Sequence, residues 1–281
     1  MTTIEFFGRS DIGSKRERNE DSFLCLDLGP LSRGLSVPAV LLTVADGIGG
    51  QAGGAVASLV ATDSLRDSFA EALRILSSPP DWPKLLVDTF QEANRRILER
   101  IGLDINLTGM GTTLVAAVIT EGVAHVANIG DSRAYRVRGE QIIQITQDHS
   151  WVAEQARLRP VSEWEMSRSP FRHMITRSLG FDPEVRADVF RIDLAGGDFV
   201  LLCSDGLYSA LTDRDLARAF GRNAEPKTIC LRLLESADRA GSRDNITAVV
   251  ARFGAPGAKD KGRKASRESR RAGKGQGRPV R

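Results

Sequence analysis

Apolar runs alternate with helical and polar patterns along the chain, and the first clear element is a strand. Residues 40–45 form a short apolar run rich in branched side chains, and D-G-I-G-G follows it directly. This pattern is typical of a buried strand that enters a glycine turn. From residue 52 to 76 the apolar positions recur at helical spacing until S-S-P-P-D-W-P breaks the pattern. A second helix is predicted after it, with apolar side chains between residues 86 and 101 on one face.

Strand patterns dominate the next part of the chain. Short spacers, E-G, G-D-S and G-E, separate segments of strand character at residues 112–120, 123–129, 133–138 and 141–146. Such short spacers predict consecutive antiparallel pairs. Further strands are predicted at 198–203 and 245–253, with helices near 213–220 and 226–240. Together these elements indicate strands gathered into sheets with helices outside.

The composition is that of a folded protein, and we expect one large domain. Hydrophobic residues make up 41% of the 281 residues and charged residues 27%. The longest apolar stretch is far below the roughly 20 residues that span a bilayer, and the amino terminus does not have the pattern of a secretory signal. The three cysteines, Cys25, Cys203 and Cys230, lack C-x-x-C spacing. A cytoplasmic location, with reduced thiols, is therefore expected.

Charge separates the end of the chain from its body. The last 23 residues carry ten Lys or Arg and two acidic residues, which is a net charge of +8. Because the whole chain has a net charge of +3, the remaining residues carry 3 − 8 = −5. This stretch has almost no large apolar side chain and is predicted to be disordered. The sequence indicates a body at residues 1–254 and a basic tail at 255–281, through which contact with nucleic acid or an acidic surface stays open.

Four aspartates, each placed where an apolar run ends or begins, are the strongest chemical signal. They are Asp46 in A-D-G-I-G-G, Asp131 in I-G-D-S-R, Asp205 in C-S-D-G-L and Asp244 in R-D-N-I-T. A carboxylate at the end of a buried strand costs desolvation energy unless something pairs with it. Four of them favour a cluster of divalent cations, which prefer oxygen ligands.

Seven short motifs together resemble a known enzyme family. They are S-D-I-G-S-K-R-E-R-N-E-D-S-F at residues 10–23, D-G-I-G-G at 46–50, G-M-G-T-T at 109–113, G-D-S-R at 130–133, H-M-I-T-R-S-L-G at 173–180, C-S-D-G-L at 203–207 and R-D-N-I-T at 243–247. In this order the chain resembles the metal-dependent type 2C (PPM) serine/threonine protein phosphatases, in their compact bacterial form. The resemblance covers about residues 3–253 and excludes only the tail.

The resemblance implies an α+β fold and a single catalytic domain. The expected architecture is a four-layer αββα sandwich of two antiparallel sheets flanked by helices, with a metal site at one edge between the sheets. Residues 150–172, where the periodicity is lost, resemble the flap that lies beside this site in bacterial relatives. We expect a monomer.

The resemblance also assigns roles to individual residues. Asp46 would bridge two Mn²⁺ or Mg²⁺ ions, the Gly47 carbonyl would bind one of them, and Asp205 with Asp244 would complete the other. Asp131 would bind a weaker third ion and share Asp205. Glu20 and Asp21 would hold metal-bound waters. Arg16 would bind the substrate phosphate through its planar guanidinium.

The implied reaction is hydrolysis of phosphoserine and phosphothreonine on proteins, in opposition to a serine/threonine kinase. A hydroxide bridging two dications would attack phosphorus, so no covalent intermediate is needed. One departure leaves an alternative open: eukaryotic relatives carry a histidine where Ile48 stands, and bacterial relatives often carry one where Gln51 stands. Without either proton donor, the alternative is a phosphoprotein-binding pseudophosphatase or scaffold. His173, which begins the H-x-x-T-R match, is expected to fix the flap to the body, and His149 is interpreted as a loop residue.

Overall fold

The structure is a computed structural model that describes residues 3–32, 35–49, 53–76, 78–158, 169–171, 174–221 and 224–254. The predictions for Gln51, His173, the tail at 255–281 and residues 159–168 and 172 of the flap fall outside these residues. Gly50, the last residue of D-G-I-G-G, lies outside them as well.

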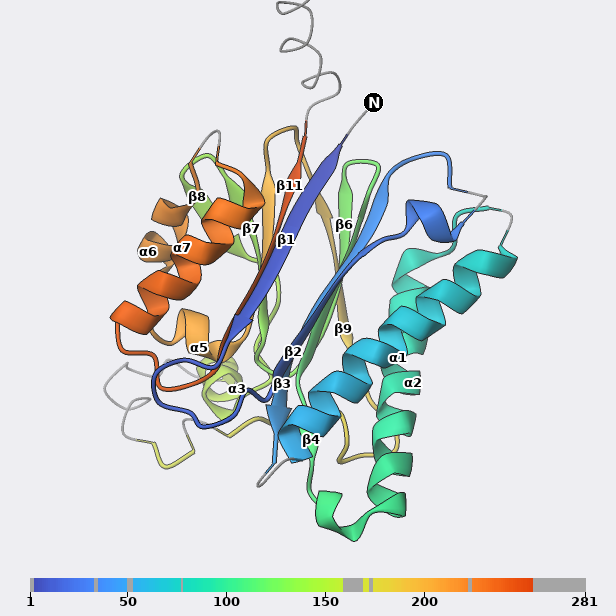
Figure 1. Cartoon of the computed structure of the whole chain (residues 1–281), viewed down its shortest axis with the longest axis vertical. Coiled ribbons are helices and arrows are strands. Elements are labelled where there is room, and N and C mark those ends of the chain that lie inside the picture. The colour runs from blue at the N-terminus through green and yellow to red at the C-terminus, as the bar shows by residue number, and fades with distance from the viewer. Residues whose placement is uncertain are drawn as a thin grey trace, which may run out of the picture.

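Two antiparallel sheets form the centre of the molecule (Figure 1). Sheet I has the order β1 (Ile4–Asp11), β11 (Ile246–Phe253), β10 (Phe199–Cys203), β7 (Arg133–Arg138) and β8 (Gln141–Gln144). Sheet II has the order β2 (Asp21–Asp27), β3 (Ala39–Ile48), β5 (Leu114–Thr120), β6 (Val123–Ile129) and β9 (Asp188–Asp193). The short strand β4 (Gly111–Thr112) pairs with the end of β3.

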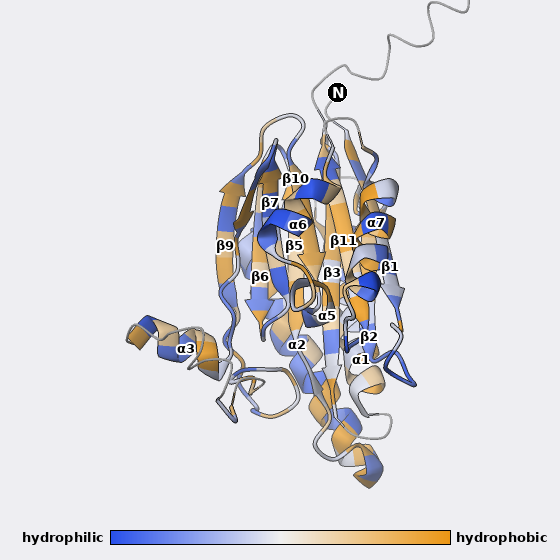
Figure 2. Cartoon of the chain, turned by 90° about the vertical axis from the view of Figure 1, so that its left-hand side faces the viewer, coloured by the Kyte–Doolittle hydropathy of each residue, from blue (hydrophilic) through white to orange (hydrophobic). Residues whose placement is uncertain are grey.

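Helices cover the outer face of each sheet. The long helices α1 (Gly53–Ile75) and α2 (Trp82–Leu103) pack on sheet II, whereas α5 (Asp205–Tyr208), α6 (Asp213–Ala219) and α7 (Pro226–Arg239) lie on sheet I (Figure 1). Helix α3 (Trp151–Leu158) projects beside one end of the sandwich (Figure 2). Two 3-10 turns, η1 (Gly29–Leu31) and η2 (Ile105–Leu107), complete the regular structure of the described residues. The predicted four-layer αββα sandwich is confirmed.

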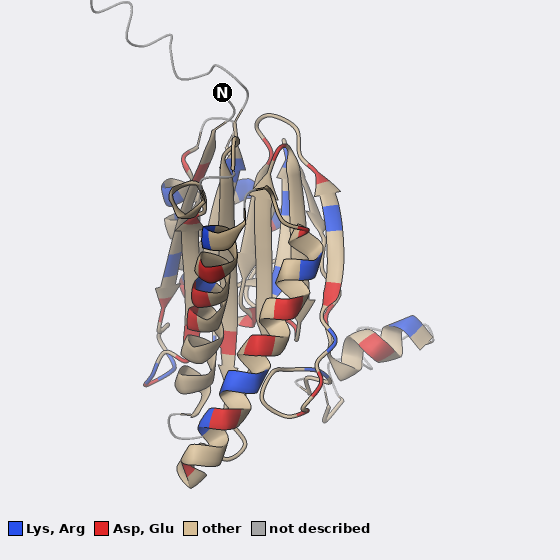
Figure 3. Ribbon diagram, turned by 90° about the vertical axis from the view of Figure 1, so that its right-hand side faces the viewer, with Lys and Arg blue, Asp and Glu red and all other residues tan. Residues whose placement is uncertain are grey.

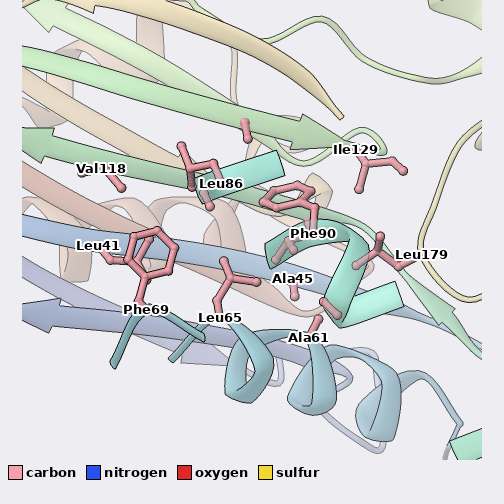
Figure 4. Packing of buried hydrophobic residues seen from close by; sticks show 14 of the residues in the cluster. Leu41, Ala45, Ala61, Leu65, Phe69, Leu86, Phe90, Val118, Ile129 and Leu179 are labelled. Atoms are coloured by element: carbon pink, nitrogen blue, oxygen red, sulfur yellow. The ribbon is translucent and has the colours of Figure 1, made fainter. Parts of the chain in front are cut away.

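Three layers of buried apolar side chains hold these elements together. One layer joins α1 and α2 to sheet II, where Leu65 and Phe69 pack beside Leu86 and Phe90 (Figure 4). A second joins α5, α6 and α7 to sheet I, and the third lies between the sheets. Because both faces of the central strands are buried, β5 is apolar at almost every position.

The buried positions of helix α1 explain why this helix could be predicted from the sequence. Its buried side chains Ala57, Ala61, Leu65 and Phe69 recur every fourth residue, so they form one stripe that faces sheet II. The opposite faces of α1 and α2 carry interspersed acidic and basic residues (Figure 3). The predicted helix at 52–76 agrees with α1 to within a residue at each end among the described positions.

Strands β1, β2 and β9 were not predicted from the sequence, and all three lie at sheet edges. Their residues are mostly half-buried and include polar side chains, which weakens the apolar signal that marks central strands. The predicted strand at 112–120 is also interrupted, because Thr113 separates β4 from β5. These differences change the number of strands but not the layers.

Candidate active site

The acidic residues singled out in the sequence meet at one end of the sandwich. Asp21, the first residue of β2, lies directly opposite Asp46 near the end of β3. In sheet I, β10 ends while β7 and β11 begin at the same end. Asp205, Asp244 and Asp131 therefore lie just beyond those strand ends. The antiparallel order brings together residues separated by more than 200 positions in the chain.

Asp21 connects the two sheets at this end. Its Oδ2 atom accepts hydrogen bonds from Ser204 Oγ at 2.7 Å and Thr247 Oγ1 at 2.6 Å, and both donors belong to sheet I or its continuation. The amide of Asp21 donates to Asn19 Oδ1 at 3.1 Å. Asp21 is thus held by groups from three segments, with one carboxylate oxygen already engaged.

The backbone of Asp46 is fixed on the side of β5. Its amide donates to Thr113 Oγ1 at 3.0 Å, and its carbonyl accepts from the Thr113 amide at 2.9 Å and from Thr112 Oγ1 at 2.9 Å. Thr113 Oγ1 also shares a hydrogen bond with Ser132 Oγ at 2.7 Å. The break between β4 and β5 therefore supplies the hydroxyl that positions Asp46.

Asp205 carries an unpaired oxygen in a buried position. It follows β10 as the first residue of α5, and its buried Oδ1 atom has no hydrogen-bond partner. A Cβ atom on the next residue, Gly206, would lie 2.1 Å from the Asn245 carbonyl oxygen. Glycine is required at 206 because α5 begins directly against the Asp244–Asn245 turn.

The carboxylates destabilise one another's charge. Burial, followed by the charges of Asp21, Asp205, Asp131 and Asp244, raises the pKa of Asp46 well above its usual value. Burial raises the pKa of Asp21 and of Asp131 to about 7, and that of Asp205 to about 6. Buried carboxylates with raised pKa values are typical of functional sites.

Glu20 adds a further carboxyl group at the edge of this cluster. Burial raises its pKa above the usual value, while the charge of Arg16 acts in the opposite direction. The Glu20 side chain lies against α1, because a Cβ atom on Gly54 would be 2.9 Å from Glu20 Oε1. Glu20 therefore stands between the start of α1 and the end of β3, as a water-binding group beside Asp46 would require.

Arg16 lies in the loop between β1 and β2 and faces the cluster. Its Nη2 atom donates to Asp244 Oδ2 at 2.6 Å, and 47% of the side chain is exposed. A planar guanidinium that is half in solvent and beside the carboxylates is suited to receive a phosphate group. The structure thus places Arg16, the residue expected to bind the substrate phosphate, beside Asp244.

Asn245 holds the Arg16 loop in place, a role that the sequence analysis missed. Its Nδ2 atom donates to the carbonyls of Ile12 and Arg18, each at 2.9 Å, and its Oδ1 atom accepts from the Glu20 amide at 2.8 Å. One buried amide thus satisfies three backbone groups of the loop. The R-D-N-I-T motif contained this signal, but an asparagine beside an acidic ligand gives no indication of its partner.

The Asp131 turn depends on His149, which the sequence analysis interpreted only as a loop residue. The buried His149 ring accepts the Gly130 amide at Nδ1, at 3.1 Å, and its other nitrogen donates to Asp188 Oδ2 at 3.0 Å. Burial lowers the pKa of His149, which favours this neutral tautomer. Gly130 has φ of +99°, and a Cβ there would lie 2.6 Å from the Thr113 side chain.

The arrangement fits hard divalent cations. All candidate ligands are oxygens, Asp205 Oδ1 lacks a partner, and Gly47 permits close backbone approach, since a Cβ there would lie 2.2 Å from the Gly54 carbonyl oxygen. As the side chains stand, no group of three or more His, Cys, Asp and Glu residues in the described ranges is placed to hold one ion. Asp244 is engaged by Arg16, so an ion that uses Asp244 has to compete with this pair.

Replacing Asn245 by alanine is expected to destabilise the protein by about 1–3 kcal/mol, because the Glu20 amide and two loop carbonyls lose their partner. Urea unfolding checks this value. The surface variant Asn106→Ala, which removes only a local contact to Asp104, serves as the matched control and should change stability much less. Equal stability of the two variants would contradict the anchoring role.

Comparisons with known proteins agree with this geometry. A family model described as Protein phosphatase 2C matches residues 10–230. The serine/threonine phosphatase stp of Listeria innocua is 32% identical over 242 residues, which cover 86% of this chain and 93% of the relative. The structure of the Mycobacterium tuberculosis serine/threonine phosphatase PstP/Ppp superposes with a TM-score of 0.78 at 30% identity, over 91% of this chain and 100% of that one. A structure of the PstP catalytic domain in complex with two manganese ions has a TM-score of 0.76 at 30% identity, with the same shares covered.

Proposed function

The chain belongs to the protein phosphatase 2C family, as a serine/threonine protein phosphatase of bacterial type, and we propose that the acidic end of its sandwich is the catalytic site. The observation that carries the proposal is the convergence of Asp21, Asp46, Asp131, Asp205 and Asp244 at one end of the sandwich. Burial and repulsion between the carboxylates raise the pKa values of the first four. Such a cluster needs cations to carry negative charge at neutral pH.

The proposed ligand roles are those that the family resemblance implies, and the hydrogen bonds of Asp205 and Asp21 support two of them. Asp46 and Asp205, with the Gly47 carbonyl, are proposed to hold the cations, and Asp244 joins them when it leaves Arg16. Asp131 is proposed as the ligand of a third, weaker ion. Asp21 already accepts two hydroxyl groups at Oδ2, which suits a role in orienting a cation-bound water rather than in direct ligation.

Glu20 is proposed to share this water-orienting role. It directly precedes Asp21, and its amide is held by Asn245. Two carboxyl groups on consecutive residues would supply acceptor oxygens for waters bound to the cations.

Two divalent cations, when bound, supply the Lewis acidity that lets water attack phosphorus at neutral pH. The protein's own groups position the substrate. Arg16 would bind the phosphate oxygens through its guanidinium, and Asn245 holds the Arg16 loop beside Asp244. Ile48 offers no proton, so a water molecule or another group would have to protonate the leaving serine or threonine oxygen.

The cofactor and the cellular setting are proposed on chemical grounds. Mn²⁺ and Mg²⁺ both prefer oxygen ligands and retain water, and the donor set suits either. Phosphorylated proteins are the substrates, and a serine/threonine kinase is the opposing activity. Within the described residues no helix has the length and apolar character needed to cross a bilayer. The free thiols of Cys25, Cys203 and Cys230 support the proposal of a reducing, cytoplasmic location.

The domain division is also a proposal. Residues 1–254 are proposed to form a monomeric catalytic unit, and the basic tail at 255–281, which falls outside the described residues, is proposed not to be needed for turnover. Contact of this tail with nucleic acid or an acidic surface rests on its charge alone.

Removing metal tests the proposed function. Purified protein treated with a chelator is expected to lose at least 99% of its release of phosphate from a phosphothreonine peptide, roughly a hundredfold, because water is then no longer activated. Added Mn²⁺ or Mg²⁺ should restore it, as measured by free phosphate. Turnover of equal rate without metal would contradict the mechanism, and metal-dependent peptide binding without phosphate release would instead support a pseudophosphatase.

A further inference from the structure

A groove of about 250 Å³ opens at the edge of the candidate active site. It is lined by Ile48, Ile175, Thr176, Arg177, Ser178, Phe181 and Asp182. Ile48 is only two residues from Asp46, so the groove starts where β3 leaves the acidic cluster. A neighbouring hollow of about 380 Å³ shares Arg177, Ser178 and Asp182 and continues this depression along the surface.

The wall of the groove is held rigidly by α2. The buried Asn94 donates from Nδ2 to the Asp182 carbonyl at 2.7 Å and accepts the Gly180 amide at Oδ1 at 2.8 Å. Gln91 similarly binds the Pro183 carbonyl at 2.9 Å and the Val185 amide at 3.1 Å. A wall fixed in advance needs little ordering when a ligand binds.

The floor of the groove is equally constrained. Leu179 pairs with Thr112 through two backbone hydrogen bonds of 3.1 and 2.9 Å, which attach the wall to β4. The Phe181 ring lies over Gly111, where a Cβ atom would be 2.4 Å from the ring. Phe181 is therefore held by its packing but keeps 52% of its surface exposed.

Three of the seven lining residues, Ile48, Ile175 and Phe181, are apolar, and the others include the charged side chains of Arg177 and Asp182. Arg177 donates to Asp188 Oδ1 at 3.2 Å, so its charge is paired. Ile48 and Ile175 are half-buried, and together with Phe181 they leave an apolar surface beside a charged site. Covering such a surface is favourable by roughly 25 cal/mol per Å² of apolar area removed from water.

We propose that this groove binds an apolar side chain of the phosphoprotein substrate, close in sequence to the phosphorylated residue. The proposal rests on the proposed function and deepens it. The volume is below the roughly 300–1,000 Å³ of pockets that enclose small-molecule ligands, and it suits a single large side chain. Ile48 lies two residues beyond Asp46 on β3, so a side chain in the groove lies near the proposed phosphate site.

The test uses the full chain with Mn²⁺ and a set of phosphothreonine peptides. Each peptide is built from alanine and serine, with one leucine placed in turn at each position near the phosphothreonine. A leucine at one position is expected to raise kcat/KM by about tenfold over the leucine-free peptide, a modest value for one buried apolar group. No preference at any position would overturn the proposal.

The variant Phe181→Ser assigns the preference to the groove. The ratio between the leucine peptide and the leucine-free peptide should fall toward one, whereas Ile143→Ser, an equally exposed apolar position on β8, should retain the full ratio. If Phe181→Ser does not fold, Ile175→Ser replaces it as the groove variant, and the same fall in the ratio is expected. An unchanged ratio in the folded groove variants would overturn the inference.

A small aryl phosphate, which has no side chain to fill the groove, distinguishes failure of this inference from failure of the proposed function. Wild-type protein that hydrolyses an aryl phosphate with Mn²⁺ but shows no leucine preference refutes only the groove. Wild-type protein that hydrolyses neither the aryl phosphate nor any peptide refutes the proposed function and the groove with it.

Discussion

An Asp46→Asn variant is expected to lose roughly three orders of magnitude in kcat/KM, about 4 kcal/mol of transition-state stabilisation. Asparagine keeps the size of the side chain, and the backbone contacts of residue 46 to Thr112 and Thr113 do not involve the carboxylate. The fold is therefore retained while the negative charge proposed to hold the cations is removed. Steady-state kinetics with a phosphothreonine peptide over a range of Mn²⁺ concentrations measures the loss.

A matched control lies on the neighbouring strand. Asp27 ends β2 opposite Val40, at the far end of the strand from Asp21, and its carboxylate accepts only the Gly29 amide at 3.0 Å among the contacts described. Asp27→Asn is expected to keep wild-type activity within about twofold. If Asp46→Asn retained more than a tenth of the activity with its fold intact, Asp46 would not be a metal ligand.

The metal-free protein is expected to lose stability as the pH rises, and Asp21 supplies much of this effect. Burial raises the pKa of Asp21 from 3.8 to about 7. The folded protein therefore binds this proton more tightly than the unfolded chain does. The stabilising effect is complete below pH 4 and is lost as the pH rises through about 7, at a cost of up to about 4 kcal/mol.

Other groups also change the pH dependence of stability: the lowered pKa of His149 makes the folded protein less stable as the pH falls below the usual histidine pKa. The variant Asp21→Asn isolates the contribution of Asp21. With a chelator at pH 8, Asp21→Asn is expected to melt roughly 5–10 °C above the wild type, and at pH 5 the difference should shrink. Mn²⁺ should stabilise the wild type at pH 8. Calorimetry at the two pH values measures these shifts, with Asp27→Asn as the control. If the variant were less stable than the wild type at pH 8, the ionised Asp21 carboxylate would not destabilise the folded protein, and the prediction would be wrong.

Most of the central elements were predictable from the sequence, because the central strands are buried on both faces and the helices bury apolar side chains at a regular spacing. The stripe that places Leu65 and Phe69 toward sheet II is a helical period in the sequence, and the apolar run of β3 is typical of a buried strand. The edge strands β1, β2 and β9 were not predictable in this way. Their half-buried side chains depend on which neighbour happens to cover them.

The candidate site shows the same division. Motif order identified Asp46, Asp205 and Asp244, but it contained no indication that Asn245 would hold the Arg16 loop. It also missed the contact between His149 and the Gly130 turn. These are bonds between segments far apart in the chain, and their donors and acceptors are identified only when the segments meet.

The sequence by itself determined the chemistry: which carboxylates are available, which glycines permit close approach, and where the proton-donating histidine is absent. Local composition and order decide these properties. The tertiary structure alone decided that Ser204 and Thr247 join Asp21 across the sheets, and that Ile48 opens into a groove with Phe181. The physical reason is that antiparallel register and helix packing set the distances between remote residues, and charge repulsion, hydrogen bonding and apolar contact all act through those distances.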